Sequence, residues 1–295
     1  MRVAAIDLGT NSTRLLVADV DEGQVHEVER ALQITRLGEG VDERRRLLPL
    51  PIARVRNVLS DFRRTIERLR IDRALAVATS AVRDAENGEA FLGEIERSYG
   101  FATRLLSGDE EAALTFRGVT SDRNLEPGTL IVDIGGGSTE LILAEAHLSL
   151  DVGSVRLTER FGEDADAAGA FVAELLPSLE VRSAIGVAGT ITSLAALDLG
   201  LVEYDPERVH GHPLSAGAVE EQLVRLAGLP LDERRRVPGL DPERAPVIVA
   251  GAAILREILR HFELDQIETS ERDLLHGIAL TASELPAPAN DAASL

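Results

Sequence analysis

Cysteine and lysine are both missing from this sequence of 295 residues, and each absence excludes a class of chemistry. Without cysteine the chain has no disulfide bond, no thiolate metal ligand and no thiol nucleophile, which agrees with a cytoplasmic location. All 31 basic residues are arginine, so a Schiff-base lysine and the lysine of a P-loop are also excluded. No run of about 18 or more apolar residues occurs, and an apolar strand pattern begins at once. We therefore expect neither a membrane span nor a signal peptide.

Acidic residues outnumber basic ones by 50 to 31, so the formal net charge is −19. This balance argues against binding to duplex nucleic acid, which favours a basic surface. A polyanionic substrate would need local neutralisation by backbone N–H groups, metal ions and a few arginines. The run Arg44–Arg46 is either a solvated surface or a patch that neutralises such a substrate. The length favours about two domains.

The stretch Leu130–Leu141, LIVDIGGGSTEL, combines apolar, glycine and acidic residues in one short pattern. Apolar residues that lead into Asp133 and three glycines predict a buried strand ending in a tight loop. Such a loop aims several N–H groups at one place, which suits a phosphate. Asp133 and Glu140 flank the loop with the carboxylate oxygens that Mg²⁺ prefers. A plain hairpin turn has the same local pattern, so this stretch alone leaves both interpretations open.

A second copy of this pattern, Val3–Arg14 (VAAIDLGTNSTR), begins the chain. The two copies share an aspartate, a glycine and a Ser-Thr pair: Asp7 and Asp133, Gly9 and Gly135, Ser12-Thr13 and Ser138-Thr139. The repeat predicts a duplicated domain with a phosphate loop in each half and a cleft between the halves. A polar segment with a Pro-Gly turn at 120–128 predicts the boundary. We therefore expect domains at 1–122 and 123–285 and a flexible tail at 286–295.

Ser107 and Glu110 fit a capping box, S-x-x-E, at the start of a helix through Phe116. Glu110 then has the structural task of accepting a hydrogen bond from the Ser107 N–H. Glu111 has no such task and points about 100° away around the helix. It is therefore a candidate general base, although the helix dipole alone also favours an acidic residue in a first turn.

Two strand ends are further candidates for ligand contacts. Arg83 follows a short strand predicted at 74–78, where open α/β sheets place ligands, and a surface salt bridge is its alternative role. Ala188–Ser193 is a strand–Gly–Thr–helix junction, whose helix N-terminus either binds an anion or is capped by Thr190. Apolar spacing also predicts an amphipathic helix at 51–70 and a long helix at 242–262.

Ordered motifs along nearly the whole chain resemble the exopolyphosphatase/guanosine pentaphosphate phosphohydrolase family. The similar segments are DLGTNSTRLLVADV (7–20), ATSAVRDAENG (78–88), SGDEEA (107–112), DIGGGSTEL (133–141), GSVRLTERF (153–161), VHGHPLS (209–215), PERAPVIVAGAAIL (242–255) and SERDLLHGIAL (270–280). The resemblance implies an α/β fold of two duplicated ribonuclease H-like (actin-like ATPase) domains with a cleft between them. The resemblance is to the short two-domain members of the family, which lack a C-terminal helical module. It also implies a homodimer. Ala188 stands where the family usually has glycine.

The loops and the resemblance together predict the site. The resemblance assigns the role of catalytic base to Glu111, the second glutamate of its pair. The predicted ligands of Mg²⁺, with Mn²⁺ as the other candidate ion, are Asp7, Asp133 and Glu140. The predicted substrate-binding residues are those of the two loops and one arginine: Gly9, Thr10, Asn11, Ser12, Arg83, Gly135, Gly136, Gly137, Ser138 and Thr139.

The predicted reaction is hydrolysis of the terminal phosphate of inorganic polyphosphate by a water that a glutamate activates with metal assistance. The first alternative is 5′-phosphohydrolysis of guanosine pentaphosphate (pppGpp), which uses the same chemistry. A kinase that passes phosphate to a small acceptor is disfavoured, because no acceptor domain is recognisable. A non-enzymatic sensor of polyphosphate or nucleotide is disfavoured by the carboxylates at 7, 111, 133 and 140.

Overall fold

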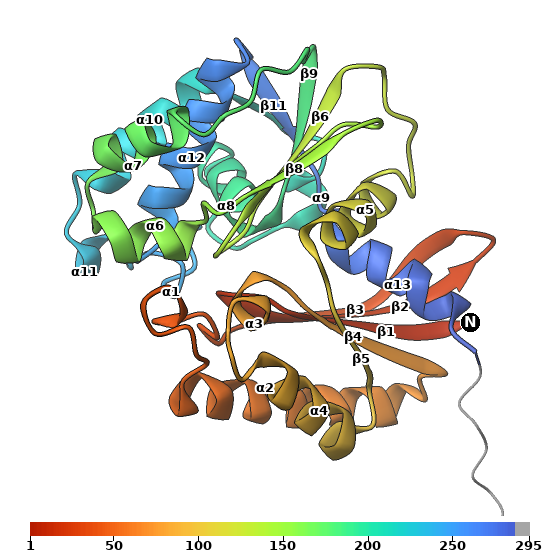
Figure 1. Ribbon diagram of the computed structural model, residues 1–295. Helices are drawn as coiled ribbons and strands as arrows, with labels where there is room; N and C mark the ends of the chain where they lie inside the picture. Colours follow the sequence, from red (N-terminus) through yellow and green to blue (C-terminus); the bar gives the residue numbers. More distant parts are fainter. Residues whose placement is uncertain (287–295) are drawn as a thin grey trace, which may run out of the picture.

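Two β-sheets carry the fold, one in each half of the chain, in a computed structural model that describes residues 1–286 (Figure 1). Apart from Pro286, the predicted tail lies outside these residues. The strands of the first sheet are β1 (Arg2–Leu8), β2 (Ser12–Asp21), β3 (Gln24–Ile34), β4 (Arg73–Ala78) and β5 (Ala102–Leu105). Their order is β3-β2-β1-β4-β5, with β1 to β3 antiparallel and β4 and β5 parallel to β1. The central strand β1 is almost wholly buried, which explains its nearly continuous apolar sequence.

The second sheet repeats this arrangement. Its strands are β6 (Thr129–Ile134), β7 (Thr139–Ile142), β8 (His147–Leu150), β9 (Ser183–Val187), β10 (Pro213–Ser215) and β11 (Gln266–Thr269). Their order is β10-β11-β9-β6-β7-β8. Taken from the opposite edge, β8-β7-β6-β9-β11 corresponds strand by strand to β3-β2-β1-β4-β5 of the first sheet, and β10 is an additional edge strand. Asp7 and Asp133 lie near the ends of the equivalent strands β1 and β6. The predicted duplication is therefore confirmed.

Helices cover the outer face of each sheet (Figure 1). These helices are α1 (Val41–Arg44), α2 (Pro49–Leu69), α3 (Ser80–Arg83) and α4 (Gly88–Tyr99) in the first half, and α6 (Ser154–Phe161), α7 (Ala165–Ala173), α8 (Ala188–Asp198), α9 (Pro206–Val209), α10 (Ala216–Ala227), α11 (Leu231–Arg234) and α12 (Ile248–His261) in the second. Val55, Leu59 and Phe62 of α2 are buried in one core with residues of β1, β2 and β4, which confirms the amphipathic helix predicted at 51–70. Residues of α8, α10 and α12 form the larger core on the second sheet.

The inner faces of the two sheets are covered by two helices that are exchanged between the halves. Helix α5 (Gly108–Val119) belongs to the first half, but Val119 packs in a core with β6, β7 and β9 of the second sheet. Helix α13 (Leu274–Glu284) belongs to the second half, but Ile278 packs in a core with β1, β2 and β4 of the first sheet. The N-terminal turns of both helices reach the space between the sheets. The division at residue 122 stays a prediction.

The crossing of α5 and α13 depends on two glycines. A Cβ atom at Gly277 would overlap the carbonyl oxygen of Leu114, and one at Gly118 would overlap that of Asp273. We expect Gly277→Ala to lower the free energy of unfolding by about 1–3 kcal/mol, measured by chemical denaturation, because the overlap forces the helices apart. The control is Gly217→Ala in α10, where an added Cβ meets nothing nearer than 3.9 Å and stability should not fall. Equal midpoints for the two variants would contradict the close crossing.

One predicted helix starts later than expected. The helix predicted at 242–262 begins at Ile248, and residues 242–247 form turns instead. Pro246 explains the difference, because proline has no N–H to donate and disfavours helical backbone in the residue before it. The predicted start was therefore wrong, and the turn carries Arg244 to the space between the sheets. Among the helices described here, none has both the length and the apolar character needed to cross a membrane.

Candidate active site between the two sheets

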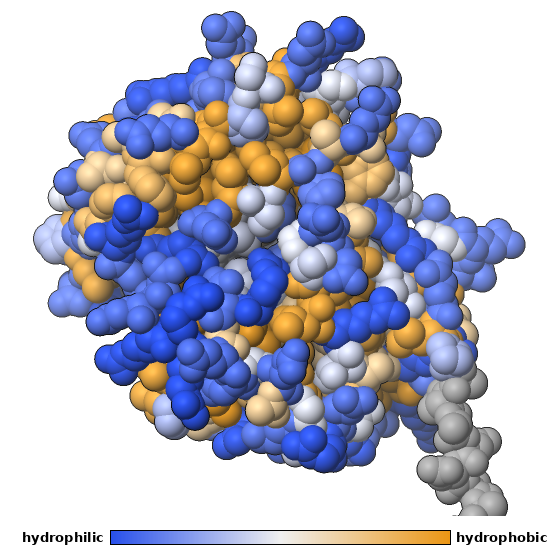
Figure 2. Space-filling view, viewed as in Figure 1, coloured by the Kyte–Doolittle hydropathy of each residue, from blue (hydrophilic) through white to orange (hydrophobic). Residues whose placement is uncertain are grey.

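The loops that follow β1 and β6 face each other across a small cavity of about 80 Å³. Most of the predicted site residues line this cavity: Asp7, Gly9, Thr10, Asn11, Ser12, Glu111, Asp133, Gly135, Gly136 and Ser138. Residues far apart in the sequence therefore meet at one place, between the halves of the molecule. On the face shown in Figure 2, hydrophilic residues gather along the seam between these halves.

The second loop packs directly against the first. A Cβ atom added to Gly136 would lie 3.0 Å from the Thr10 Cβ, and one added to Gly137 would lie 2.5 Å from the Ser80 Oγ. The Thr10 and Ser80 hydroxyl oxygens are themselves 2.8 Å apart. Only glycine allows the second loop to come this close, so the glycines bring the N–H groups of the two loops to one cavity.

Two of the predicted loop residues do not line the cavity. The hydroxyl of Thr139 is buried and donates to the carbonyl of Val152 at 2.6 Å, so this side chain holds the hairpin to the next segment. Gly137 faces Ser80 and Thr10 instead of the cavity. Thr139 and Gly137 therefore hold the loop against its neighbours in the protein. Their assignment as substrate-binding residues stays a prediction.

The capping box at the start of α5 is confirmed. The Ser107 N–H donates to Glu110 Oε2 at 2.8 Å, and the Glu110 N–H donates to Ser107 Oγ at 3.2 Å. Glu110 is exposed, whereas Glu111 is only 7% exposed and lines the cavity. The two adjacent glutamates therefore face different surroundings, as the helix geometry predicts.

Glu111 is fixed by Arg83, which does not line the cavity itself. Arg83 Nη1 donates to the Leu106 carbonyl at 2.7 Å and lies 3.4 Å from Glu111 Oε2. Burial raises the pKa of Glu111 well above its usual range, the charges of Glu140 and Asp133 raise it further, and Arg83 opposes them. A carboxylate with a raised pKa is a stronger base once it is ionised.

Asp133 and Glu140 form a buried acidic pair behind this residue. Burial, followed by the charge of Glu140, raises the pKa of Asp133 to about 8. Burial also raises the pKa of Glu140, while hydrogen bonds from Ser138 and Ser149 lower it. Glu140 accepts the Ser149 hydroxyl at 3.0 Å and does not line the cavity. Asp133 and Glu140 are partners in the register of the paired strands β6 and β7. Two neighbouring buried carboxylates need a cation or a proton nearby.

Two features of these carboxylates fit a divalent cation. Asp7 Oδ1 is buried and has no hydrogen-bond partner within residues 1–286. Asp133 and Glu140 are buried, and burial is the main cause that raises the pKa of each carboxyl, so a cation beside them would favour their ionised forms. No three acidic or histidine side chains in these residues converge on one point as a complete ligand set. Mg²⁺ suits such a partial set, because it keeps several water or phosphate oxygens as ligands.

Sequence reasoning missed two arginines that line the cavity. Arg14 on β2 follows the first loop and contacts Asp7, with 2.7 Å between Nη2 and Oδ2. Arg244 lies in the turn before α12, and a Cβ on Gly189 would overlap its guanidinium. Within the described residues the Arg244 guanidinium forms no hydrogen bond or ion pair, whereas its backbone N–H donates to the Asp241 carbonyl at 2.9 Å. An arginine without a protein partner beside two phosphate loops is suited to bind an anion.

The junction at Ala188–Ser193 reaches the same cavity, which Ala188, Gly189 and Thr190 help to line. No side chain of residues 1–286 caps the N-terminus of α8, so capping by Thr190, one of the two roles considered, is not observed. Ala188 has a φ of 66°, in the left-handed region that favours glycine. The junction is thus held in a less favourable backbone conformation at the edge of the site.

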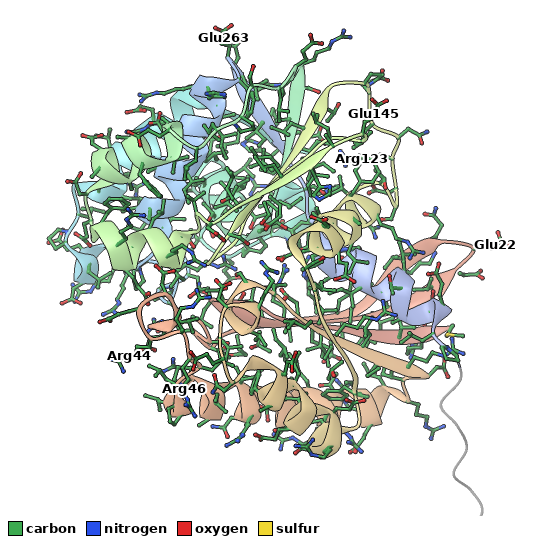
Figure 3. All side chains as sticks on the ribbon, in the orientation of Figure 1. Glu22, Arg44, Arg46, Arg123, Glu145 and Glu263 are labelled. Atoms are coloured by element: carbon green, nitrogen blue, oxygen red, sulfur yellow. The ribbon has the colours of Figure 1, made fainter. Side chains whose placement is uncertain are left out.

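The arginine run Arg44–Arg46 lies away from this cavity. Figure 3 shows Arg44 and Arg46 pointing outward from the first half, and all three side chains are exposed. Of the two roles considered for this run, the structure favours the solvated surface.

A larger cavity of about 530 Å³ adjoins the first one. The two share Arg14, Gly189 and Arg244 in their linings. The larger cavity also has apolar and aromatic lining, including Tyr204 and Leu240. The space between the two loops therefore continues into a roomier one.

Two sheets share the order of five strands, and each has a glycine-rich loop after the equivalent strand, with a cavity between the halves. This is the architecture expected of two duplicated ribonuclease H-like domains. The predicted fold class is confirmed. A model of the Ppx/GppA phosphatase family matches residues 16–285, and the chain belongs to this family. Its members hydrolyse phosphoanhydride bonds, so the prediction of an enzyme is also confirmed.

Individual relatives match over most of this chain. Exopolyphosphatase 2 of Mycobacterium tuberculosis is 38% identical to this chain in an alignment of 312 positions. The alignment covers 95% of this chain and 98% of the relative. The guanosine-5′-triphosphate,3′-diphosphate pyrophosphatase of Vibrio vulnificus is 30% identical, over 94% of this chain and 58% of its own length. The crystal structure of the Aquifex aeolicus member of the Ppx/GppA family has a TM-score of 0.80 at 32% identity, over 96% of this chain and 98% of that one.

Proposed function

We propose that this chain is an exopolyphosphatase, which hydrolyses the terminal phosphate of inorganic polyphosphate. The observation that carries this proposal is the position of Glu111. It is a buried carboxylate at the N-terminal turn of α5, it lines the cavity between the two phosphate loops, and its neighbour Glu110 is used for capping. The M. tuberculosis relative, which this chain matches over 98% of the relative's length, is named an exopolyphosphatase.

In the proposed reaction Glu111 accepts a proton from the attacking water. The water oxygen forms a bond to the terminal phosphorus while the bridging P–O bond breaks, which leaves orthophosphate and a chain shorter by one phosphate. Backbone N–H groups of the two loops bind the phosphate oxygens. Arg83 orients the Glu111 carboxylate, because it contacts that side chain and not the cavity.

Asp7, Asp133 and Glu140 are the residues that would hold Mg²⁺, directly or through water. The unpartnered Asp7 Oδ1 and the buried acidic pair are the features that fit it. When bound, the ion would supply positive charge to the phosphate oxygens. Asp7 and Asp133 line the cavity and Glu140 does not. Glu140 would therefore contact the ion through a water, or orient the other two ligands.

A substrate panel tests the proposed function. Phosphate release is measured from tripolyphosphate, long polyphosphate, pppGpp and ATP, with Mg²⁺ or with a chelator. We expect the highest kcat/KM with polyphosphate and Mg²⁺, because the N–H groups of the two loops around the smaller cavity recognise phosphate oxygens. Release from ATP only, or from none of the four, would contradict the proposal.

The larger cavity favours pppGpp as the second candidate substrate. Two of its three lining arginines are already paired: Arg30 with Glu271 at 2.7 Å, and Arg14 with two carboxylates. Arg244, at the border with the smaller cavity, is then the main positive charge that it offers to a long polyanion. Its volume and its aromatic residue Tyr204 suit an organic group. A higher kcat/KM for pppGpp than for either polyphosphate would make this candidate the function.

The pH dependence of the reaction should follow Glu111. Its pKa is raised, and only the ionised form accepts a proton, so kcat/KM should rise with pH through that raised pKa. The charge of Arg83 lowers this pKa, so Arg83→Leu should move the acidic limb to higher pH. Profiles of both enzymes at saturating Mg²⁺ measure the shift. Arg97→Leu on the exposed face of α4 is the control, and an acidic limb equal in all three enzymes would contradict the assignment.

A further inference from the structure

Arg14 is bound between two carboxylates that come from opposite ends of the chain. Its Nε donates to Asp7 Oδ2 at 2.8 Å, and its Nη1 donates to Asp273 Oδ2. The side chains of Arg14 and Asp273 are 13% and 3% exposed, so water competes little for these contacts. The exchange of α13 between the halves brings Asp273, the residue before its first turn, to this place.

Asp273 is itself fixed by its surroundings. Its Oδ1 accepts the Leu275 N–H at 2.9 Å, which caps α13. Its backbone N–H donates to Nδ1 of the fully buried His276 at 3.3 Å, and Nε2 of that ring lies 2.9 Å from Glu27 Oε1. One carboxylate oxygen of Asp273 therefore serves the helix. The other binds Arg14 and also lies 3.7 Å from Arg30 Nη2, so Arg14 is its nearer partner.

We propose that Asp273 is a positioning residue for the reaction: it holds the Arg14 guanidinium on Asp7 and away from the bound phosphate chain. Arg14 lines both cavities, yet its charge is shared between two carboxylates. Asp7 is thereby fixed through Oδ2 alone, and its Oδ1 keeps no protein partner in the described residues. The proposal rests on the proposed phosphohydrolase function.

Loss of the charge of Asp273 should therefore have two opposite effects. The guanidinium of Arg14 would be free to turn to a phosphate oxygen, so a polyphosphate should bind more tightly. Asp7 would lose its fixed orientation, so the reaction should slow. Damage to the fold alone would weaken binding and turnover together.

The variants must separate this role from the capping of α13. Asp273→Asn keeps one side-chain oxygen for the cap and removes the charge, and Asp273→Ser keeps only a capping hydroxyl. The matched control is Asp164→Asn, because Asp164 caps the outer helix α7 by accepting the Ala167 N–H at 2.9 Å. Thermal midpoints of all three variants monitor the fold.

Calorimetric titration with tripolyphosphate and steady-state kinetics test the proposal. We expect Asp273→Asn and Asp273→Ser to lower kcat about 10- to 100-fold while tripolyphosphate binds about threefold more tightly or better. Asp164→Asn should change neither quantity. Binding that is weaker or unchanged, or a kcat equal to that of the wild type, would overturn the positioning role. If the wild type releases no phosphate, the proposed function fails, and the titration still decides whether Asp273 restrains Arg14.

Discussion

Replacing Glu111 with glutamine should lower kcat for phosphate release by about 10² to 10⁴ and leave KM nearly unchanged. Glutamine has almost the same shape as glutamate and can still accept a hydrogen bond from Arg83, but it cannot take a proton from the attacking water. The fold should tolerate the change well. Burial and two neighbouring carboxylates raise the pKa of Glu111 by more than Arg83 lowers it, so removal of its charge should relieve more repulsion than the attraction to Arg83 that is lost. Phosphate release and the thermal midpoint are measured on the same samples.

Glu110→Gln is the matched control for this experiment. It changes the adjacent residue of the same helical turn, which bonds to the Ser107 N–H and is exposed. We expect a loss of stability of up to about 1 kcal/mol from the weaker cap and a kcat close to that of the wild type. Equal kcat values for Glu111→Gln and the wild type would show that another group activates the water.

The fold was predictable from the sequence where a local pattern determines the structure. The two strand–Asp–loop–strand hairpins are read directly from alternating apolar and glycine-rich segments, and their repetition predicts the duplicated sheets. The capping box separates Glu110 from Glu111 by helix geometry alone. These features depend on neighbours in the sequence, so a single sequence is sufficient to predict them.

The exchange of α5 and α13 could not be predicted in this way. Whether a helix packs on its own sheet or on the other one depends on contacts between distant segments, such as those at Gly118 and Gly277. A glycine in the sequence does not by itself indicate that two helices cross there. The role inferred for Asp273 depends on this exchange, so it follows only from the structure.

Arg244 was missed for a different reason. The apolar spacing of α12 extends the predicted helix back to Pro242, which would have placed Arg244 on a regular helix. Pro246 was the available signal, because a proline five residues into a predicted helix marks a probable later start. The resulting turn directs Arg244 to Gly189, where the absence of a side chain leaves room for the guanidinium.

Arg244→Ala should therefore lower kcat/KM for polyphosphate by about 10² to 10³, the effect of losing one preorganised donor to a phosphate. In the part of the chain that the structure describes, this guanidinium has no hydrogen-bonding partner, so its donors remain available to the substrate. Arg244→Lys should recover part of the loss, because it restores the charge but not the planar set of donors.

Arg235→Ala is the control for a general loss of positive charge. Arg235 is exposed near the end of α11, and among residues 1–286 it pairs only with Asp232, at 3.4 Å. Its removal should therefore leave kcat/KM within about twofold of the wild type. Comparison of the two alanine variants at low and high salt separates a specific contact from long-range attraction, since salt screens only the latter strongly. A loss for Arg244→Ala no larger than that for Arg235→Ala would show that the unpaired guanidinium does not contact the substrate.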